Sequence, residues 1–431
     1  HKVETAVFGH RLGDHRGNLV FVADIARGGR GGAAGIATAS SILKRNAKVT
    51  IAVVDPATDH YYQPGWTMVG AGVFTPEQTR KAESDIMPKG VKWVRLPAVA
   101  IDPDRNTVEL EDGDTLTYRV LVVAPGLRLA WEKIEGLPEA LGRNGVTSNY
   151  RYDLAPYTYQ LVKELRQGRA LFSQPPMPIK CAGAPQKAMY LSCDIWRDSG
   201  VLPAIDVEFH NAGAALFGVP TYVPALMEYV EKYGIDLRLE SNLVAVDADR
   251  RVATFERKQD GVSERIEREF DMLHVVPPQV SHAVVANSPL AAASGFVEVD
   301  ETTLRHKRFE NIFGLGDAAG TSNAKTAAAA RVQAPVVAVN ALAALDGRPP
   351  VADYNGYGSC PLTVERGKIV LAEFGYGGKL LPSFPSWLLD GTRPTRTAWF
   401  LKERMLPPIY WQGMLKGREW MAAPHEIGKA A

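Results

Sequence analysis

Three cysteines offer redox chemistry in this sequence: Cys181, Cys193 and Cys360. Cys181 stands between a predicted strand and the start of a helix, where the helix dipole and the neighbouring Lys180 and Lys187 favour the thiolate. Cys360 lies in a turn-rich segment with several glycines and a proline. Two thiols beside a flavin form an electron-transfer unit, in which a substrate thiolate opens a disulfide and the released thiolate passes an electron pair to the flavin.

The alternative for each cysteine is a buried small hydrophobe, which is the usual role of a lone thiol. Cys193 falls inside the helix predicted after Cys181, and we expect it to be such a core residue. The loop settings of Cys181 and Cys360 favour a reactive role. Because these two residues are far apart in the sequence, only the fold can bring them together.

The composition excludes several classes of protein. The chain has 431 residues, 46% of them hydrophobic and 23% charged, the balance of a globular protein of two or three domains. Its formal net charge of +1 lacks the basic excess of a nucleic-acid binder. The cysteines do not have the spacing of a zinc, iron–sulfur or haem site, so no metal is expected. No run of about 18 apolar residues occurs, so no membrane-spanning helix is expected either.

The elements that would position a flavin begin with a strand, a glycine turn, a helix and a second strand. They are predicted at residues 18–25, 28–35, 36–45 and 48–54. Glycines let the backbone approach a pyrophosphate at the positive helix end, and Asp55 after the second strand can accept ribose hydroxyl groups. The candidate glycines are Gly29, Gly31, Gly32 and Gly35. The alternative is a glycine-rich loop without a ligand, since Arg30 intrudes among them.

A second half of the same site is predicted far along the chain. A strand at residues 116–124 is followed by Gly126, and a short strand within 311–320 delivers Asp317 to a turn before an alanine-rich helix from about Lys325. An Asp at such a strand end can hydrogen-bond a polyol chain, and the helix N-terminus can stabilise negative charge on a reduced ring. The alternative role of this Asp is a helix N-cap.

Between these halves the alternation of strands and helices repeats, which predicts a second doubly wound domain inserted into the first. Its strands are predicted at residues 178–181, 206–211 and 271–276, and its helices at 186–197 and 224–233. The turn that would hold the phosphates of a nicotinamide cofactor carries Cys181 and Pro185 in place of glycines. This substitution argues against NAD(P)H binding.

Five segments resemble those of the sulfide:quinone oxidoreductases. They are residues 60–70 (HYYQPGWTMVG), 178–187 (PIKCAGAPQK), 207–210 (VEFH), 313–317 (FGLGD) and 359–362 (SCPL). The first two are highly specific, and the match is best with the branch that includes the mitochondrial enzymes. The resemblance extends from about residue 31 to the end of the chain.

The resemblance implies an α/β fold like that of glutathione reductase, with two Rossmann-like dinucleotide-binding domains and a C-terminal amphipathic membrane-binding region. The implied domains are an FAD-binding domain at 18–145 and 295–380, a second Rossmann-like domain at 146–294, and the C-terminal region at 381–431. The implied cofactor is FAD, and no cysteine near Gly126 could attach it covalently. Added to the candidate glycines and acids, the resemblance makes Gln63, Gly126 and Lys325 cofactor-binding candidates. Lys325 would adjoin the pyrimidine edge of the flavin, or else be a solvated lysine at a helix end.

The resemblance further implies a Cys181–Cys360 disulfide, or a trisulfide, over one face of the flavin and a quinone on the other. Sulfide would attack Cys360 and leave a persulfide there, and Cys181 would then react with the flavin. A small-molecule sulfur acceptor would remove the sulfur, and a membrane quinone would reoxidise the flavin. Formation of a homo-oligomer is left open.

The C-terminal segment has the composition of an interfacial anchor. Residues 391–420 are basic and rich in tryptophan and other aromatics, and we predict two short helices broken at Pro407 and Pro408. The alternative is an ordinary packing helix pair or a dimer contact. The candidates for the mouth of a quinone site are Phe384, Phe400, Tyr410 and Trp411. We expect a peripheral, monotopic protein of a bacterial plasma membrane or a mitochondrial inner membrane.

Three other functions are weighed against this one. A flavin subunit of a sulfide dehydrogenase that donates to a cytochrome would carry similar cysteines, but the basic aromatic tail argues against it. An NADH:quinone oxidoreductase would need the missing second glycine motif. A non-catalytic membrane flavoprotein would fit if the irregular glycine turn abolished FAD binding.

Overall fold

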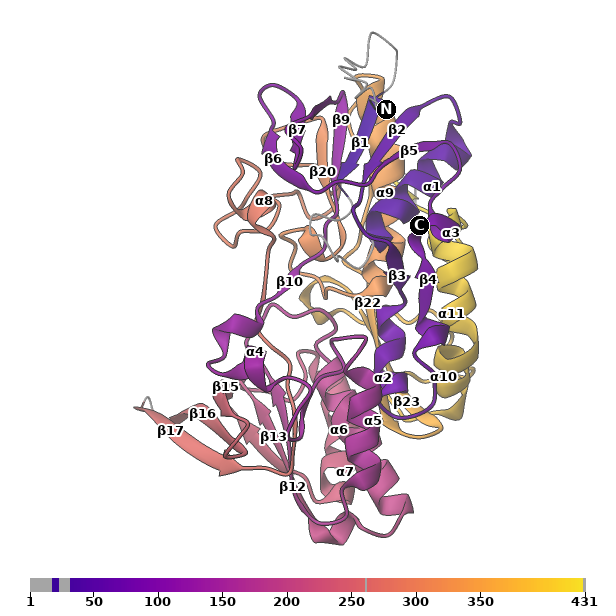
Figure 1. Ribbon diagram of the computed structural model, residues 1–431. Helices are drawn as coiled ribbons and strands as arrows, with labels where there is room; N and C mark the ends of the chain where they lie inside the picture. Colours follow the sequence, from indigo (N-terminus) through magenta and orange to yellow (C-terminus); the bar gives the residue numbers. More distant parts are fainter. Residues whose placement is uncertain (1–17, 23–31, 260–261, 429–431) are drawn as a thin grey trace, which may run out of the picture.

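The computed structural model describes residues 18–22, 32–259 and 262–428. The predicted glycines Gly29 and Gly31, together with Arg30, lie outside the described residues. The molecule has two lobes, each built on a parallel sheet, and the C-terminal segment runs along the side of both (Figure 1).

The first sheet has five parallel strands in the order β5-β2-β1-β9-β20. Their bounds are Val91–Val94, Thr50–Val54, Asn18–Val22, Val120–Val123 and Ile312–Gly314. The chain thus leaves this sheet after β9 and returns to it with β20, which is the discontinuous arrangement of a doubly wound nucleotide-binding fold.

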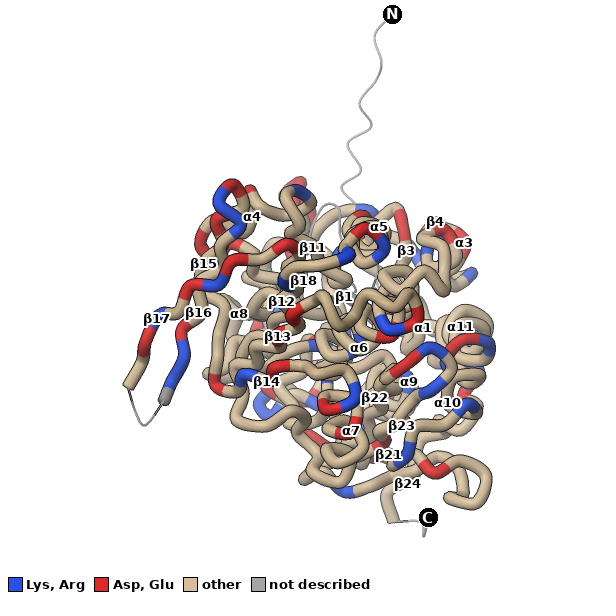
Figure 2. The backbone as a smooth tube through the Cα atoms, turned by 90° about the horizontal axis from the view of Figure 1, so that it is seen from below, with Lys and Arg blue, Asp and Glu red and all other residues tan. Residues whose placement is uncertain are grey.

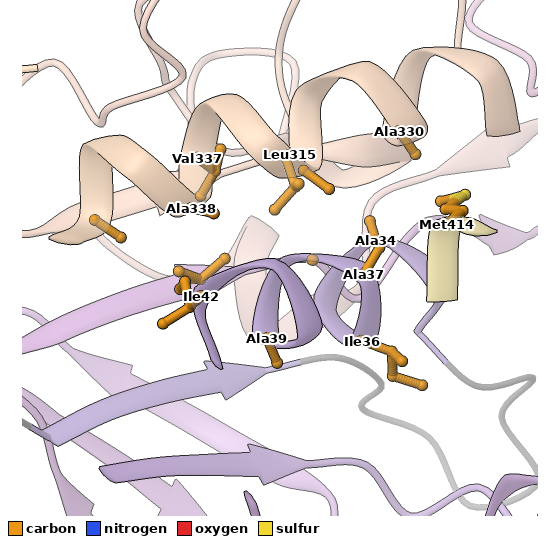
Figure 3. Packing of buried hydrophobic residues seen from close by; sticks show 14 of the residues in the cluster. Ala34, Ile36, Ala37, Ala39, Ile42, Leu315, Ala330, Val337, Ala338 and Met414 are labelled. Atoms are coloured by element: carbon orange, nitrogen blue, oxygen red, sulfur yellow. The ribbon is translucent and has the colours of Figure 1, made fainter. Parts of the chain in front are cut away.

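Two helices cover one face of this sheet: α1 (Ala33–Arg45) and α9 (Ala327–Leu345). Small residues line their contact, with Ala34 and Ala37 of α1 facing Ala330 and Ala338 of α9 (Figure 3). Without bulky side chains, the two helices can approach closely. Among the described residues, α9 alone is long and apolar enough to cross a membrane by length and composition, but it is mostly buried, as a core helix is.

The prediction of one strand over residues 116–124 was wrong. The chain forms β8 (Thr115–Thr117) in a small antiparallel sheet with β6 (Ala98–Asp102) and β7 (Thr107–Leu110), and then β9 in the main sheet. The backbone bends at Tyr118, whose N–H donates to the carbonyl of Asn106. Residues 116–124 therefore contribute to strands in two different sheets.

The second lobe repeats the plan with the parallel order β14-β13-β12-β18-β11. These strands are Asp236–Leu239, Ile205–Asn211, Gly168–Gln174, Met272–His274 and Val146–Thr147. Helices α5 (Ala155–Glu164), α6 (Ala184–Asp198) and α7 (Val223–Tyr233) pack beside it. A three-stranded antiparallel sheet projects from it, formed by β15 (Ser241–Asp247), β16 (Val252–Gln259) and β17 (Val262–Glu269).

Acidic and basic residues alternate along β17 and are interspersed over the rest of the chain, as the small net charge predicts (Figure 2).

Two predictions for the segments around the cysteines were wrong, one of a strand and one of a turn. Residues 178–181 are not the end of a strand, since β12 ends at Gln174 and a loop leads to α6. Cys360 is not in a turn but inside β22 (Gly358–Glu365), which pairs with β23 (Lys368–Phe374) in a two-stranded hairpin. Pro361 is tolerated there because this ribbon leaves its strands with one unpaired edge each.

The predicted break at Pro407 and Pro408 was also wrong. The backbone stays helical from α10 (Arg396–Phe400) through α11 (Leu406–Pro408) to Lys416. Wider π turns at Leu401–Met405 and Ile409–Gly413 flank the prolines. Such turns relax the i→i−4 hydrogen-bond pattern that a proline cannot complete, so the helix continues through them.

Candidate active site

A cavity of about 560 Å³ lies where the two lobes meet the C-terminal segment. Its walls come from the N-terminus of α1, the loop after β9, the β20–α9 connection, the loop before α6, and the C-terminal helix. This volume is in the range of cofactor and small-molecule sites. The two halves of the site that the sequence separates thus share one chamber.

The fold brings Cys181 and Cys360 together. Their sulfur atoms are 3.7 Å apart, a contact between two free thiols rather than the separation of about 2.05 Å in a disulfide. Cys181 lines the cavity, whereas Cys360 is only 2% exposed. Cys193 is fully buried in α6, and burial raises the pKa of its thiol, as expected of a core residue.

Cys181 is held in an unusual backbone conformation. Its φ of 51° is in the left-handed region that residues with a side chain seldom adopt. Its N–H donates to the carbonyl of Lys325 at 2.8 Å, and its own carbonyl accepts from the N–H of Ala184 at 2.7 Å. These bonds fix the loop to α9 on one side and to the first turn of α6 on the other.

Gly183, which caps α6, makes room for Cys360. A Cβ atom at this position would lie 2.6 Å from the Cys360 sulfur and would overlap the side chain of Leu362 as well. The two sulfur atoms can therefore approach because residue 183 is a glycine.

Lys187 polarises the sulfur pair. Its Nζ lies 3.1 Å from the sulfur of Cys181, and the residue is 3% exposed. The hydrogen bond from Cys360, together with the charge and hydrogen bond of Lys187, holds the pKa of Cys181 well below its usual value, against the opposing effect of burial. The same hydrogen bond to Cys181, with burial and the Cys181 charge, raises the pKa of Cys360. The contact of Lys187 with Cys181 thus favours the thiolate on Cys181 over the thiolate on Cys360.

Lys402, from the C-terminal helix, lies in the same chamber. It is 4% exposed and lines the cavity with Cys181 and Lys187. Burial, with the charge of Lys187, lowers its pKa to about 7, while the two cysteines act in the opposite direction. In the sequence, Lys402 is one of several basic residues of the C-terminal segment, and no pattern indicates that it is buried.

The described part of the glycine turn closes on the end of β2. The N–H of Gly32 donates to Oδ2 of Asp55 at 3.1 Å, and Oδ1 of the same side chain accepts from Ala57 at 2.9 Å. Gly32 caps α1 and lines the cavity, whereas Asp55 and Gly35 are buried and do not line it. In this structure Asp55 holds the turn in place.

The β20–α9 connection forms the opposite wall. Gly316 has a φ of +66°, and a Cβ there would lie 3.1 Å from that of Ala34, so a glycine is required where α1 passes. Asp317 lines the cavity, and burial raises the pKa of its carboxyl group. Lys325 donates from Nζ to the carbonyls of Asp317 at 3.0 Å and Ala319 at 2.7 Å.

The N-terminus of α9 opens into the cavity. The Thr326 hydroxyl accepts from the N–H of Ala329, and Ala327 and Ala328 line the wall. A helix of this length presents partial positive charge there, which stabilises an anion.

Known proteins resemble this chain closely. The sulfide:quinone oxidoreductase of Dictyostelium discoideum mitochondria is 41% identical over 391 residues, which cover 90% of this chain and 85% of that protein. The mitochondrial sulfide:quinone oxidoreductase of Mus musculus is 36% identical over 387 residues, with the same shares of the two chains. The chain belongs to the sulfide:quinone oxidoreductase family. The relatives are mitochondrial proteins. No family model matches the chain.

The fold of the family is found in the solved sulfide:quinone oxidoreductase structure of Aquifex aeolicus. It superposes with a TM-score of 0.74 at 17% identity and covers 94% of this chain and 92% of that one. This similarity confirms the predicted fold class of paired Rossmann-like domains.

The cavity has the polar groups that FAD, expected in a sulfide:quinone oxidoreductase, would engage. Thr67 and Asn149 line it, and their buried side-chain oxygen and amide atoms have no hydrogen-bond partner among the described residues. Gln63 accepts from Nζ of Lys180. Gly126, with a φ of 76°, lines the wall, and a Cβ atom built on it would meet no other atom within 4 Å. Orphaned buried polar atoms in a cavity that also contains the N-termini of α1 and α9 suit a bound dinucleotide.

The four residues proposed for a quinone end of this oxidoreductase separate into two pairs. Phe384 and Tyr410 line the cavity. Phe400 is 57% exposed on the outer side of α10, and Trp411 is buried in the core of the first lobe. Neither of the latter two lines the cavity. Sequence composition identifies aromatic residues of the segment, but the helical phase decides which way each one points.

Proposed function

We propose that the chain oxidises sulfide and transfers the electron pair through non-covalent FAD to a quinone. The observation that carries the proposal is a pair of cysteine sulfurs 3.7 Å apart, of which Cys181 lines a cavity built by both nucleotide-type halves of the chain and Cys360 lies buried behind it. The names of the relatives agree with this activity.

The sulfur chemistry begins from the oxidised pair. Hydrosulfide attacks the sulfur of Cys360, the bond to Cys181 breaks, and its electron pair stays on Cys181 as thiolate. The low pKa of Cys181 makes it the better leaving group, because a more acidic thiol leaves faster. Cys360 then carries the added sulfur as a persulfide.

A small nucleophilic acceptor, such as a thiolate, takes that sulfur and leaves Cys360 as a thiol. The Cys181 thiolate and the Cys360 thiol then close to a disulfide again and release two electrons and one proton. FAD, when bound, would supply the two-electron acceptor for this closure and the route of the electrons to the quinone. Lys187 stabilises the thiolate of Cys181 between these steps. A trisulfide resting state would follow the same balance with one further sulfur.

We assign the FAD-binding domain to residues 18–145 and 295–380, the second Rossmann-like domain to 146–294, and the quinone-facing region to 381–431. The residues proposed to hold FAD are Gly29, Gly31, Gly32, Gln63, Gly126, Asp317 and Lys325, and Gly35 and Asp55 are proposed to support the glycine turn from behind the cavity wall. In the FAD-binding domain, β22 and β23 pack against α6 of the second domain. This packing brings Cys360 next to Cys181.

The apolar side chains that the C-terminal segment gives to the cavity suit a quinone and a membrane surface. They include Phe384, Leu406, Ile409, Tyr410 and Met414. Exposed apolar side chains lie close by in the sequence: Trp387, Leu388, Phe400, Met405, Trp420 and Met421. Together with the basic residues of this segment they support a peripheral, monotopic attachment to the membrane.

The test is anaerobic addition of sulfide to the purified holoprotein while the flavin absorbance is recorded. We expect bleaching or a long-wavelength charge-transfer band, and recovery when decylubiquinone is added. Cys181→Ser and Cys360→Ser should each abolish the response. Cys193→Ser, which changes a buried thiol of the same helix, is the matched control and should retain it. Bleaching by NADH and not by sulfide would refute the proposal.

A further inference from the structure

A buried chain of three polar side chains links the first domain to the C-terminal helix. Nδ1 of His60 lies 3.2 Å from Oε2 of Glu83, and its Nε2 lies 2.6 Å from the hydroxyl oxygen of Tyr410. His60 and Glu83 are fully buried and Tyr410 is 6% exposed. His60 is in β3 (Asp59–Tyr61) and Glu83 begins α3 (Glu83–Ile86), so residues 350 positions apart are joined.

The partners determine the direction of each hydrogen bond. A carboxylate only accepts, so Nδ1 of His60 donates to Glu83 and fixes the tautomer of the ring. Nε2 of the neutral imidazole is then the acceptor for the Tyr410 O–H. Burial and the charge of Glu83 raise the pKa of the Tyr410 phenol, which keeps its proton for this bond.

Other charged and titratable groups surround the pair on the neighbouring elements. The ring of Tyr62 is tilted by 53° against that of Tyr410, with centroids 5.0 Å apart. Lys81, which pairs with His60 across β3 and β4 (Arg80–Ala82), has its Nζ 4.8 Å from the ring centroid of Trp411. Lys416 donates to the carbonyls of Asp85 and Ile86. These groups pack around the three residues and do not replace the two hydrogen bonds of His60.

Of these three residues, Tyr410 alone lines the cavity. The ring of His60 contacts that of Tyr410 with centroids 5.8 Å apart and that of Trp411 at 5.7 Å. A single phenol bond to a buried imidazole therefore fixes the plane of an aromatic ring in the wall. It also fixes the depth at which this part of the C-terminal helix sits against the first domain.

We infer that Glu83 and His60 are positioning residues that hold Tyr410 in the wall of the quinone end of the cavity. The inference rests on the proposed function, because it concerns the affinity of that end for a quinone. His60 and Glu83 do not line the cavity, so they act on the quinone through Tyr410. Because they act through Tyr410, reduction by sulfide should not depend on them.

The experiment measures binding of decylubiquinone to the oxidised holoprotein without sulfide, followed by quenching of flavin and tryptophan fluorescence. Tyr410→Phe and His60→Ala should each raise the dissociation constant roughly 3- to 10-fold, the effect of a lost neutral hydrogen bond. His60→Gln, whose amide oxygen can accept near the position of Nε2, should restore part of the affinity. His306→Ala is the matched control, since His306 is a buried histidine of the first domain that bonds to the carbonyl of Leu290.

The outcomes separate the two ideas. If the wild type does not bind the quinone, the proposed function fails. If the wild type binds and His60→Ala binds equally well, with flavin content retained, the positioning role is refuted. If His60→Ala loses flavin, Glu83→Gln keeps the test open, because it retains the side-chain shape and weakens only the acceptor. Equal losses of affinity in His60→Ala and His306→Ala would also refute the inference, since they would reflect general destabilisation.

Discussion

Replacing Lys187 with methionine should make the thiol of Cys181 harder to ionise. The Nζ of Lys187 lies 3.1 Å from the sulfur, and the side chain is almost completely buried, so water screens this interaction little. A hydrogen bond to a charged group contributes about 1.5–3 kcal/mol, and about 1.4 kcal/mol is a tenfold change in an equilibrium constant. The ionisation constant of Cys181 should therefore fall roughly 10- to 100-fold.

The assay is the pH profile of alkylation of the reduced protein by iodoacetamide, with the modified peptides resolved by mass spectrometry. Since the thiolate is the reacting form, the midpoint of the Cys181 profile should rise by about one to two pH units in Lys187→Met. Buried Cys193 serves as an unreactive internal reference.

The matched control is Lys180→Met. Lys180 precedes Cys181 in sequence, but its ammonium group donates to Gln63, and its replacement should leave the midpoint close to that of the wild type. The same midpoint in the wild type and in Lys187→Met would refute the electrostatic explanation of Cys181 reactivity.

Three further predictions concern other parts of the chain. Gly183→Ala places a Cβ atom 2.6 Å from the Cys360 sulfur, and the resulting displacement should lower the rate of flavin bleaching by sulfide at least about tenfold; an unchanged rate would show that the sulfur pair tolerates the added atom. Burial lowers the pKa of Lys402 from 10.5 to about 7. Between these two pH values the lysine is protonated in the unfolded protein and neutral in the folded protein. The free energy of unfolding therefore increases by up to about 1.4 kcal/mol per pH unit as the pH rises. Urea titrations at two pH values in this window should show that increment in the wild type and a smaller one in Lys402→Met, and equal increments would contradict the assignment. Trp387, 83% exposed, should contribute to membrane attachment, and Trp387→Ser should weaken cosedimentation with phospholipid vesicles about tenfold or more, whereas an unchanged bound fraction would place the membrane contact elsewhere.

The elements that carry long periodic or apolar patterns could be predicted from the sequence. Helices α6 and α7 begin and end within two residues of the predicted positions, and β13 differs by one residue. α7 buries one face, whereas α6 and β13 are buried along most of their length, and polar or glycine-containing turns bound these runs in the sequence.

Short elements near the site could not be predicted in the same way. Cys360 was placed in a turn because glycine and proline surround it, yet it pairs with Ala372 in an extended ribbon. Pro407 was expected to end a helix, but π turns on both sides accommodate it. Tertiary packing overrides local preference at these positions.

The proximity of Cys181 and Cys360 could be predicted, but the electrostatic setting of the pair only in part. Lys187 follows Cys181 closely in sequence and was expected to assist it. Lys402 comes from a helix more than two hundred residues later, and no local pattern marks it as buried. A charge that reaches a site from a distant element is visible only once the packing is known.

The bond from the Cys181 N–H to the carbonyl of Lys325 has a consequence for biosynthesis. The reactive loop takes its shape from a segment that the ribosome makes well after it, and its partner thiol arrives later still, on β22. Trp420 and Met421, made later again, complete the wall of the cavity. The redox centre therefore cannot mature, and the cavity cannot close around a cofactor, until the ribosome has made this segment.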